Sequence, residues 1–247
     1  MSVAIITGAS SGIGASLARE LGRRKWKVGV IARRADLLDS IVAEVRAAGG
    51  EAAAATADVT DRAALDAAVA ALEAALGPCD LMVANAGSGQ PAPMHKVPID
   101  TILSTMRLNF DGAVHSAGAV LPGMLERRRG HVAVVSSVAA NRGLPGHGAY
   151  SASKAAISTL WEAMRVDLAP HGVRCTTIHP GFVATPLTQK NKFKMPFLLT
   201  ADQAAGIVAD GLERGAKEIT FPWQMRWVAT LMRWLPIWAW DRMAPKR

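Results

Sequence analysis

Short apolar runs alternate with helical patterns along almost the whole chain. The apolar runs are β-branched or apolar without a helical period, which is typical of buried strands, and they span residues 3–7, 28–32, 52–59, 80–84, 131–136, 174–179 and 218–221. Helical patterns cover residues 13–24, 35–48, 61–76, 99–126, 149–171 and 200–214. Right-handed crossovers between alternating strands and helices build a parallel sheet. We therefore expect an α/β protein with a single-domain Rossmann fold: a doubly wound, seven-stranded parallel sheet with helices on both faces.

Two polar signals fix the expected starts of helices. Asp61 precedes a helical pattern as an N-cap or first-turn acid. Thr200 and Gln203 have the spacing of a capping box, which predicts a helix that ends near Gly215.

Composition narrows the class of protein. The 247 residues include 28 Lys and Arg against 20 Asp and Glu, a net charge of +8. Without zinc-finger spacing or a basic aromatic array, we interpret this excess as solvated faces plus a site for an anionic cofactor, and expect no nucleic-acid partner. Two cysteines are too few for a disulfide framework, which favours a reduced, cytoplasmic compartment. The first apolar run is read as a strand, not a signal peptide, and no run reaches the length of a spanning helix.

A glycine-rich segment joins the first strand to the first helix. It reads TGASSGIG over residues 7–14, with Gly8, Gly12 and Gly14 able to form a tight turn and admit a pyrophosphate. The free N–H groups and the dipole of the following helix favour an anion there. We expect Ser10, Ser11 and Ile13 to contact the same ligand.

A tyrosine and a lysine lie four residues apart on an expected helix. Tyr150 is the single tyrosine of the chain, and Lys154 projects from the same helical face. A nearby ammonium favours the phenolate, so we expect the pKa of Tyr150 to be lowered toward neutrality. Ser136 and Ser137 end the fifth strand, at the sheet edge where ligands bind, and either hydroxyl could hold a substrate oxygen.

The ordered motifs resemble those of the short-chain dehydrogenase/reductase family from residue 3 to about 221. The glycine loop has the family's TGxxxGxG spacing, and the spacing of thirteen residues before the tyrosine selects Ser137. The remaining matches are Asp58 and Val59 for the adenine, the Asn85-Ala86-Gly87 motif, Asn109 of the fourth helix, and the Pro180-Gly181 motif with Val183 and Thr185 after it.

The resemblance implies a reaction and roles for its residues. Ser137 and Tyr150 would meet the charge that develops on a carbonyl oxygen, and Tyr150 would supply the proton. Lys154 would also contact the nicotinamide ribose, and Asn109 would hold a water of the proton relay. The resemblance also implies transfer of the pro-S hydride without a metal. It further implies a homodimer or homotetramer that is built partly from the helices of Ile99 and Tyr150.

The end of the second strand argues for NADP(H). An acid there would bind the ribose 2′-hydroxyl of NAD, but Ala32 occupies the position where the family's NAD enzymes carry Asp. Arg33 and Arg34 follow, and a guanidinium suits a 2′-phosphate. Against this, Ser11 stands where many NADP enzymes of the family carry a basic residue.

Substrate choice in the family lies mainly in two segments, here residues 139–147 and 182–199. The second is rich in apolar residues, which favours a mobile lid over a lipophilic carbonyl or alcohol. Lys190, Lys192 and Lys194 alternate within it; they are interpreted as solvated charges, with a carrier phosphate as the alternative. A 3-oxoacyl-thioester reductase therefore stays open, as does a non-catalytic NADP-binding sensor or scaffold.

Residues 223–247 form an expected extension to the catalytic domain of residues 1–222. Five of the seven tryptophans lie between Trp223 and Trp240, and Arg226, Thr230 and Arg233 share one narrow polar stripe of a helical wheel. The segment is too short to span a bilayer. Peripheral contact with a membrane surface, coverage of the substrate pocket and burial against a second subunit all remain open.

Overall fold

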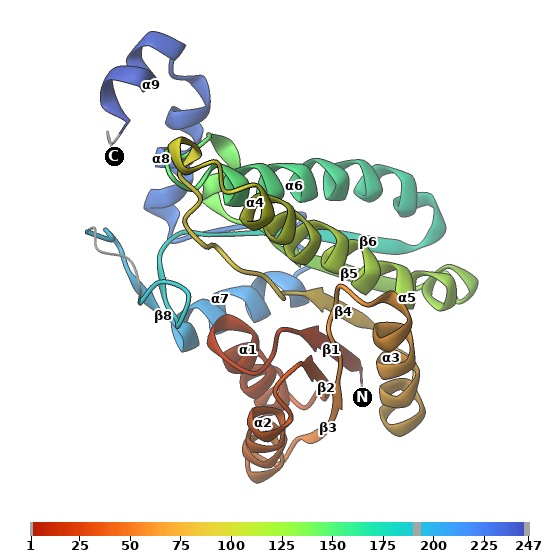
Figure 1. Ribbon diagram of the computed structural model, residues 1–247. Helices are drawn as coiled ribbons and strands as arrows, with labels where there is room; N and C mark the ends of the chain where they lie inside the picture. The colour runs from red at the N-terminus through yellow and green to blue at the C-terminus, as the bar shows by residue number, and fades with distance from the viewer. Residues whose placement is uncertain (1, 190–193, 245–247) are drawn as a thin grey trace.

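Seven parallel strands form the central sheet of the computed structural model, which describes residues 2–189 and 194–244 (Figure 1). The strand order is β3-β2-β1-β4-β5-β6-β9. The bounds are β1 Val3–Thr7, β2 Lys27–Ala32, β3 Glu51–Thr56, β4 Leu81–Ala84, β5 Gly130–Val135, β6 Val173–Pro180 and β9 Glu218–Phe221. This order confirms the doubly wound Rossmann sheet, whose direction of winding reverses between β1 and β4.

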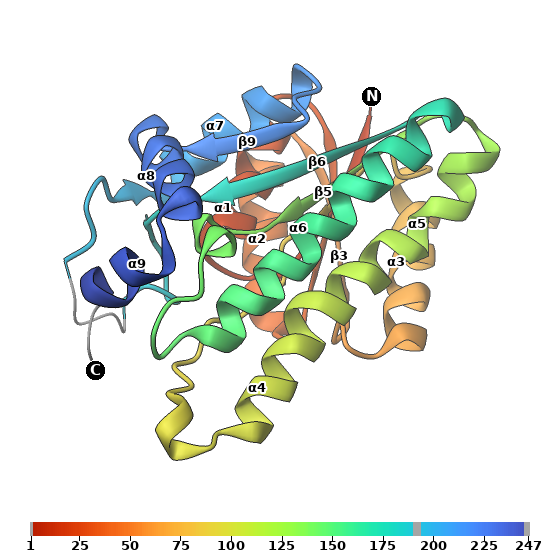
Figure 2. The same cartoon turned by 90° about the horizontal axis from the view of Figure 1, so that it is seen from above.

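Helices cover both faces of the sheet (Figure 2). One face packs against α1 Gly12–Arg23, α2 Ala35–Ala47 and α7 Ala201–Glu213. The other packs against α3 Arg62–Leu76, α5 Gly112–Glu126 and α6 Gly148–Leu168, and α4 Ile99–Met106 lies against α6. Neighbouring residues of β1 enter opposite cores, Ile5 on one side and Ile6 on the other, because side chains of a strand alternate. Burial on both faces explains why the strands are continuous apolar runs.

Both predicted helix starts are present. Asp61 Oδ1 accepts a hydrogen bond of 3.0 Å from Ala64 N, which caps α3. Thr200 and Gln203 form the capping box of α7, with bonds of 3.1 and 2.9 Å between side chain and backbone. These bonds satisfy N–H groups that a helix end leaves unpaired.

The helical pattern over residues 99–126 is divided in the structure. One π-helical segment, η2 Arg107–Asp111, separates α4 from α5. A π turn inserts one residue into the helical repeat and occurs often at functional sites. Here it contains the buried Asn109.

Several short elements lie outside the predicted set. They are the two-stranded sheet of β7 Val183–Ala184 and β8 Leu199–Thr200, and the 3₁₀ turns η1 Met94–Lys96, η3 Val138–Asn141 and η4 Ala169–His171. Pro236 separates α8 Trp223–Trp234 from α9 Ile237–Met243 at the C-terminal end. Of the helices in the described residues, none is both long and apolar enough to cross a membrane.

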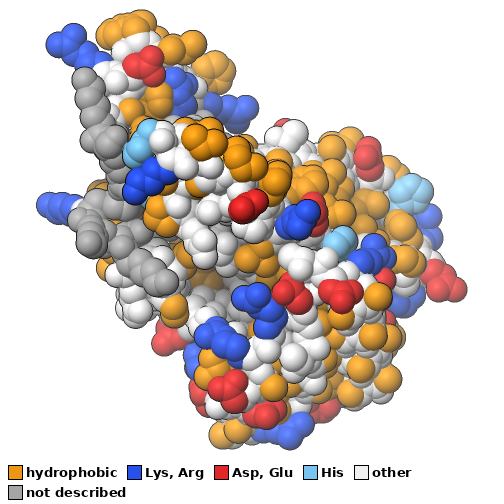
Figure 3. All heavy atoms as spheres, viewed as in Figure 1, with side chains coloured by type: hydrophobic (Ala, Val, Ile, Leu, Met, Phe, Trp, Pro, Cys, Tyr) orange, Lys and Arg blue, Asp and Glu red, His pale blue; other side chains and the backbone are white. Residues whose placement is uncertain are grey.

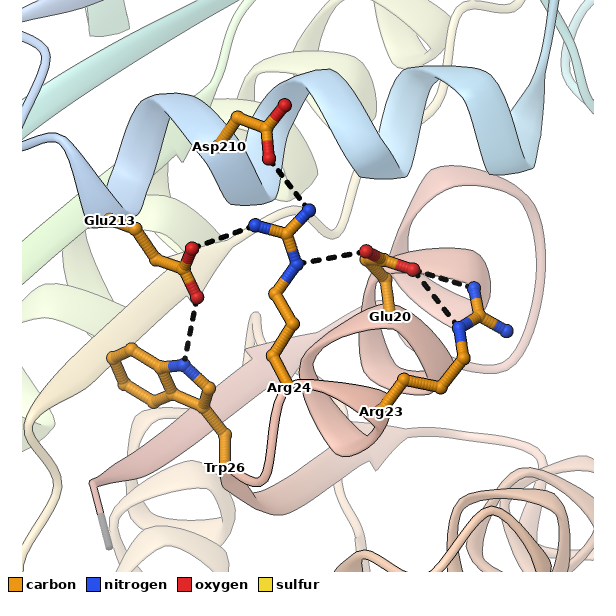
Figure 4. Close-up of polar contacts among 6 residues, drawn as sticks. All are labelled: Glu20, Arg23, Arg24, Trp26, Asp210 and Glu213. Carbon is orange, nitrogen blue, oxygen red and sulfur yellow. Dashed lines mark hydrogen bonds and ion pairs between the residues drawn. The ribbon is translucent and has the colours of Figure 1, made fainter.

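An ion-pair network ties α1 to α7 (Figure 4). Arg24, at the C-terminal end of α1, contacts Glu20 at 2.8 Å and reaches Asp210 and Glu213 of α7, each at 2.7 Å. Trp26 also donates to Glu213 at 3.4 Å. Arg23 points the other way and pairs with Glu20 alone.

Candidate active site

A cavity of about 530 Å³ lies at the carboxyl ends of the strands, beside the switch point between β1 and β4. It brings together nearly all the residues that the sequence singles out. Those that line it are Gly8, Ser10, Ser11, Gly12, Ile13, Arg33, Arg34, Asp58, Val59, Asn85, Ala86, Gly87, Ser137, Tyr150, Lys154, Pro180, Gly181, Val183 and Thr185. Gly14 and Asn109 are not part of the lining and contribute behind it.

The glycines of the loop are required by its geometry. Gly8 and Gly12 have φ of +66° and +59°, which side chains rarely adopt. A Cβ on Gly14 would lie 2.4 Å from Asn85 Nδ2. That amide donates to the carbonyls of Thr7 and Gly8 at 3.0 and 3.1 Å. Gly14 therefore admits the side chain that links β4 to the glycine loop.

The N-terminal end of α1 faces the cavity, and neither a capping side chain nor an acidic residue offsets its positive dipole end. Its N-cap, Ser11, makes no side-chain capping bond, and the first turn carries no acidic residue. Its free N–H groups and positive dipole end are therefore available to an anion. A dinucleotide pyrophosphate fits this loop.

Arginine and aspartate side chains line the end of the cavity next to β2 and β3. Arg34 Nη2 donates to Ser10 Oγ at 2.8 Å and to Ser11 Oγ at 3.1 Å, so its guanidinium lies over the glycine loop. Arg33 pairs loosely with Asp58 at 3.4 Å. The backbone N–H of Thr60, at 2.9 Å, lowers the pKa of Asp58, and Arg33 adds to the effect.

Helix α6 positions the chemical end of the cavity. The Ser137 hydroxyl lies close enough to the Tyr150 phenol to act on its pKa as a hydrogen-bonding group. Lys154 Nζ donates to Val135 O at 2.7 Å and lies 5.9 Å from the centroid of the Tyr150 ring. A phenol, a hydroxyl and an ammonium thus converge at the ends of β5 and α6.

The expected lowering of the Tyr150 pKa is wrong for this structure. Burial raises the pKa of Tyr150, and the hydrogen bond with Ser137 opposes that rise. Burial also lowers the pKa of Lys154 to about 8. Removal from water disfavours both charged forms, and the ammonium is engaged by Val135 O instead of the phenol oxygen.

The two serines at the end of β5 have different partners. Ser136 Oγ donates to Lys154 O at 3.0 Å and bonds Ser158 Oγ at 2.7 Å, so it is engaged with the backbone and side chains of α6. Ser137 Oγ accepts from Ala139 N at 3.1 Å and contacts the phenol. This arrangement favours Ser137 as the residue that meets a substrate.

Asn109 holds the loop after β4. Its Oδ1 accepts from Ser88 N at 2.8 Å, while Nδ2 donates to Ser88 O and Ser153 Oγ, both at 2.9 Å. A Cβ on Gly87 would lie 3.0 Å from Asn109 Oδ1 and 3.4 Å from Lys154 Nζ. The amide is therefore close behind the ammonium, and its bonds position the cavity wall.

Sequence reasoning missed part of the lining. Ala57, Ser88, Val135 and Thr188 also face the cavity, and no pattern in the sequence marks them individually. Pro186 and Leu187, which are among the apolar residues of the expected lid segment, line the cavity as well. Lys190, Lys192 and Phe193 lie outside the described residues. Of residues 223–244, none lines this cavity, so the structure gives no support to a tail that covers the pocket.

Comparison with known proteins agrees with this geometry. The family model "short chain dehydrogenase" matches residues 2–195. An uncharacterized oxidoreductase of Myxococcus xanthus is 44% identical over 233 residues, 94% of this chain and 92% of that protein.

Two solved structures share the fold. A short-chain dehydrogenase/reductase from Burkholderia phymatum in complex with NAD has a TM-score of 0.86 at 25% identity, covering 93% of this chain and 92% of that one. A variant of the actinorhodin polyketide ketoreductase with NADPH has a TM-score of 0.82 at 29% identity, covering 89% and 95%. One neighbour holds NAD and the other NADPH, so both bind a nicotinamide cofactor, and the comparison does not choose between the two for this chain. The chain is thus an oxidoreductase of the short-chain dehydrogenase/reductase family.

Proposed function

We propose that the chain is an NADP(H)-dependent oxidoreductase that interconverts a lipophilic carbonyl compound and its secondary alcohol. The observation that carries the proposal is the pairing of Tyr150 with Ser137 beside Lys154, in a cavity whose far end is the glycine loop. A scaffold that only binds the dinucleotide would need the loop but not these three groups.

The position of Arg34 supports NADP(H) over NAD. Its guanidinium reaches the hydroxyls of Ser10 and Ser11, so it supplies from the end of β2 the positive charge that position 11 lacks. Ala32 leaves that strand end without a carboxylate to bind a ribose 2′-hydroxyl. A 2′-phosphate can accept hydrogen bonds from the Arg34 fork and from the serine hydroxyls.

The side chains divide the chemistry between them. A bound nicotinamide supplies or accepts the hydride. Ser137 donates to the substrate oxygen and holds it at the phenol, and Tyr150 gives that oxygen its proton during reduction. The raised pKa of Tyr150 keeps the phenol protonated at neutral pH, the form that reduction requires. Lys154 then returns a proton to Tyr150. Asn109 positions the cavity wall beside Lys154, along which the proton relay reaches solvent.

The lid segment supports a lipophilic substrate. Leu187 lines the cavity, and Phe197 and Leu198 are exposed close to it along the chain. One neighbour is named as a ketoreductase, which agrees with a ketone as the reducible group.

Oxidation of NADPH tests the proposal. We expect purified protein to oxidise NADPH faster than NADH when offered lipophilic ketones or aldehydes, with acyl thioesters as the competing substrate class. Bound NADPH that no member of the panel oxidises would instead favour the scaffold.

A further inference from the structure

Helices α8 and α9 turn tryptophans outward from the body of the protein. Trp223, Trp227 and Trp234 of α8 and Trp238 of α9 are between 69 and 78% exposed. Figure 3 shows hydrophobic side chains gathered at the upper end of the molecule, where α8 and α9 lie in Figure 1. Helix α8 buries Met225 and Ala229, and none of the residues of α9 is buried. Packing within this chain therefore does not account for the tryptophans.

The exposed surface is large for a single chain. Four tryptophans of roughly 150–250 Å² each expose on the order of 500 Å² at these fractions. Leu231, Ile237 and Met243 extend the apolar surface, each at least 65% exposed. The total exceeds the roughly 300–600 Å² of the largest apolar patch on a typical monomer. A patch of this kind marks a docking surface.

Helical geometry places arginines at the edge of the tryptophan stripe. With about 100° per residue, Trp223, Trp227 and Trp234 fall within about 40° of one another. Arg226 and Arg233 fall roughly 80–100° to one side, between the tryptophans and the buried Met225. This order, aromatic stripe outside and cations at its flank, is typical of helices that lie in a membrane interface.

The charges of the segment complement an anionic surface. Residues 223–247 contain five basic residues, Arg226, Arg233, Arg242, Lys246 and Arg247, against Asp241, a net charge of +4. In the described part of the chain, Arg226 and Arg233 form no ion pair. They line a polar groove together with Arg165, Glu162 and Glu218. The α8 wall of that groove is therefore cationic, while the opposite wall is of mixed charge.

A lipid surface accounts for these features better than a second copy of the chain. A two-fold contact through this face would bring together two segments that each carry a net charge of +4, which is unfavourable. Tryptophan prefers the headgroup level of a bilayer, and each basic residue near an anionic leaflet adds to binding.

We propose that α8 and α9 dock the protein on a membrane surface that carries anionic lipids, with the tryptophans at headgroup depth and Arg226 and Arg233 on lipid phosphates. Met225 lies against Gly181, where an added Cβ would be 2.8 Å from Met225 Cγ, so α8 is fixed to the wall of the active-site cavity. In both ribbon views the two helices stand on the same side as residues 182–189 and 194–199 of the lid segment (Figures 1 and 2). The docking itself does not depend on the proposed reaction.

Co-sedimentation of the full chain with vesicles tests the proposal. We expect binding to phosphatidylcholine vesicles that contain phosphatidylglycerol, and about tenfold weaker binding to phosphatidylcholine alone. The variant Trp227→Ser/Trp234→Ser/Trp238→Ser should bind at least tenfold more weakly. The matched control Leu125→Ser/Ile207→Ser removes exposed apolar side chains of α5 and α7 and should bind like the parent.

Charge and mass complete the test. Arg226→Gln/Arg233→Gln should lose about tenfold of the binding to anionic vesicles, whereas Arg107→Gln/Arg214→Gln, with equal loss of charge, should lose much less. Melting temperatures confirm that the variants are folded. Absence of wild-type binding to anionic vesicles overturns the proposal. A smaller molecular mass of the tryptophan variant in solution also overturns it, since the face would then join copies of the chain.

Discussion

Arg34 is the residue on which the cofactor proposal rests. Its fork reaches two hydroxyls of the glycine loop, and the neighbouring Arg33 is turned toward Asp58. A guanidinium held over the loop can distinguish a 2′-phosphate from a 2′-hydroxyl by roughly 1.5–3 kcal/mol.

Arg34→Leu should therefore lower kcat/KM for NADPH about ten- to hundredfold and change that for NADH little. Steady-state kinetics with both cofactors measure the effect, with Arg107→Leu, an exposed arginine on η2, as control. An equal loss for both cofactors would mean that Arg34 only supports the loop.

Burial of Lys154 makes the stability of the folded protein depend on pH. Its pKa of about 8 differs from the usual 10.5 because the side chain is buried, so the unfolded chain binds more protons between these values. Below pH 8 the buried ammonium therefore destabilises the folded protein by its full amount. This destabilisation disappears as the pH rises toward 10.5.

Relative to Lys154→Met, the wild-type free energy of unfolding should thus rise by about 3 kcal/mol from pH 8 to 10.5. Urea unfolding across this range measures it. Lys217→Met, at an exposed lysine, should show no such difference. If the difference in unfolding free energy between wild type and Lys154→Met did not change with pH, the lowered pKa of the buried lysine would be contradicted.

At the scale of elements, the sequence predicted what is periodic and long. The seven strands and the helices that cross between them follow from apolar runs and amphipathic periods, within a residue or two at most ends. The strands β7 and β8 have two residues each and carry no periodic pattern. The π turn at Arg107–Asp111 could not be predicted from the sequence either, because the residues on both sides of it continue the same helical pattern.

The contact between α1 and α7 is one that no local pattern predicts. Arg24 reaches Glu213, a carboxylate 189 residues away in the sequence. Although partial burial opposes it, hydrogen bonds with Asp210, Glu20 and Glu213 raise the pKa of Arg24 above its usual value.

Arg24→Met should lower the free energy of unfolding by about 1–3 kcal/mol, because Asp210 and Glu213 lose their arginine and Glu20 keeps only Arg23. Arg23→Met removes a more exposed arginine that pairs with Glu20 alone, and should cost less than about 0.5 kcal/mol. Chemical denaturation of both variants checks the ranking. Equal losses would show that the bridge to α7 contributes nothing.

At the scale of the whole molecule, the sequence predicted which residues meet but not their environment. Motifs from eight segments converge on one cavity, as the switch point of a doubly wound sheet requires. The pKa of Tyr150 was predicted in the wrong direction because burial and the Val135 carbonyl arise only from tertiary packing.

Assembly is a further expectation at this scale. Ile99 and Leu103 of α4 and Val166 of α6 are at least 50% exposed, which favours these two helices as an interface between copies. Leu103→Glu/Val166→Glu should therefore convert a dimer or tetramer to a smaller species in sedimentation equilibrium. Ala71→Glu/Ala75→Glu, exposed on α3, serves as the control. An unchanged mass of the first variant would place the interface elsewhere.

The central claim is proton transfer by the phenol that Ser137 contacts. Its most direct measurement is turnover and NADPH binding of Tyr150→Phe, which removes one oxygen and leaves the ring. We predict that kcat falls by about 10²–10⁴ while the Kd for NADPH stays within about twofold. Turnover that matches the wild type would contradict the mechanism.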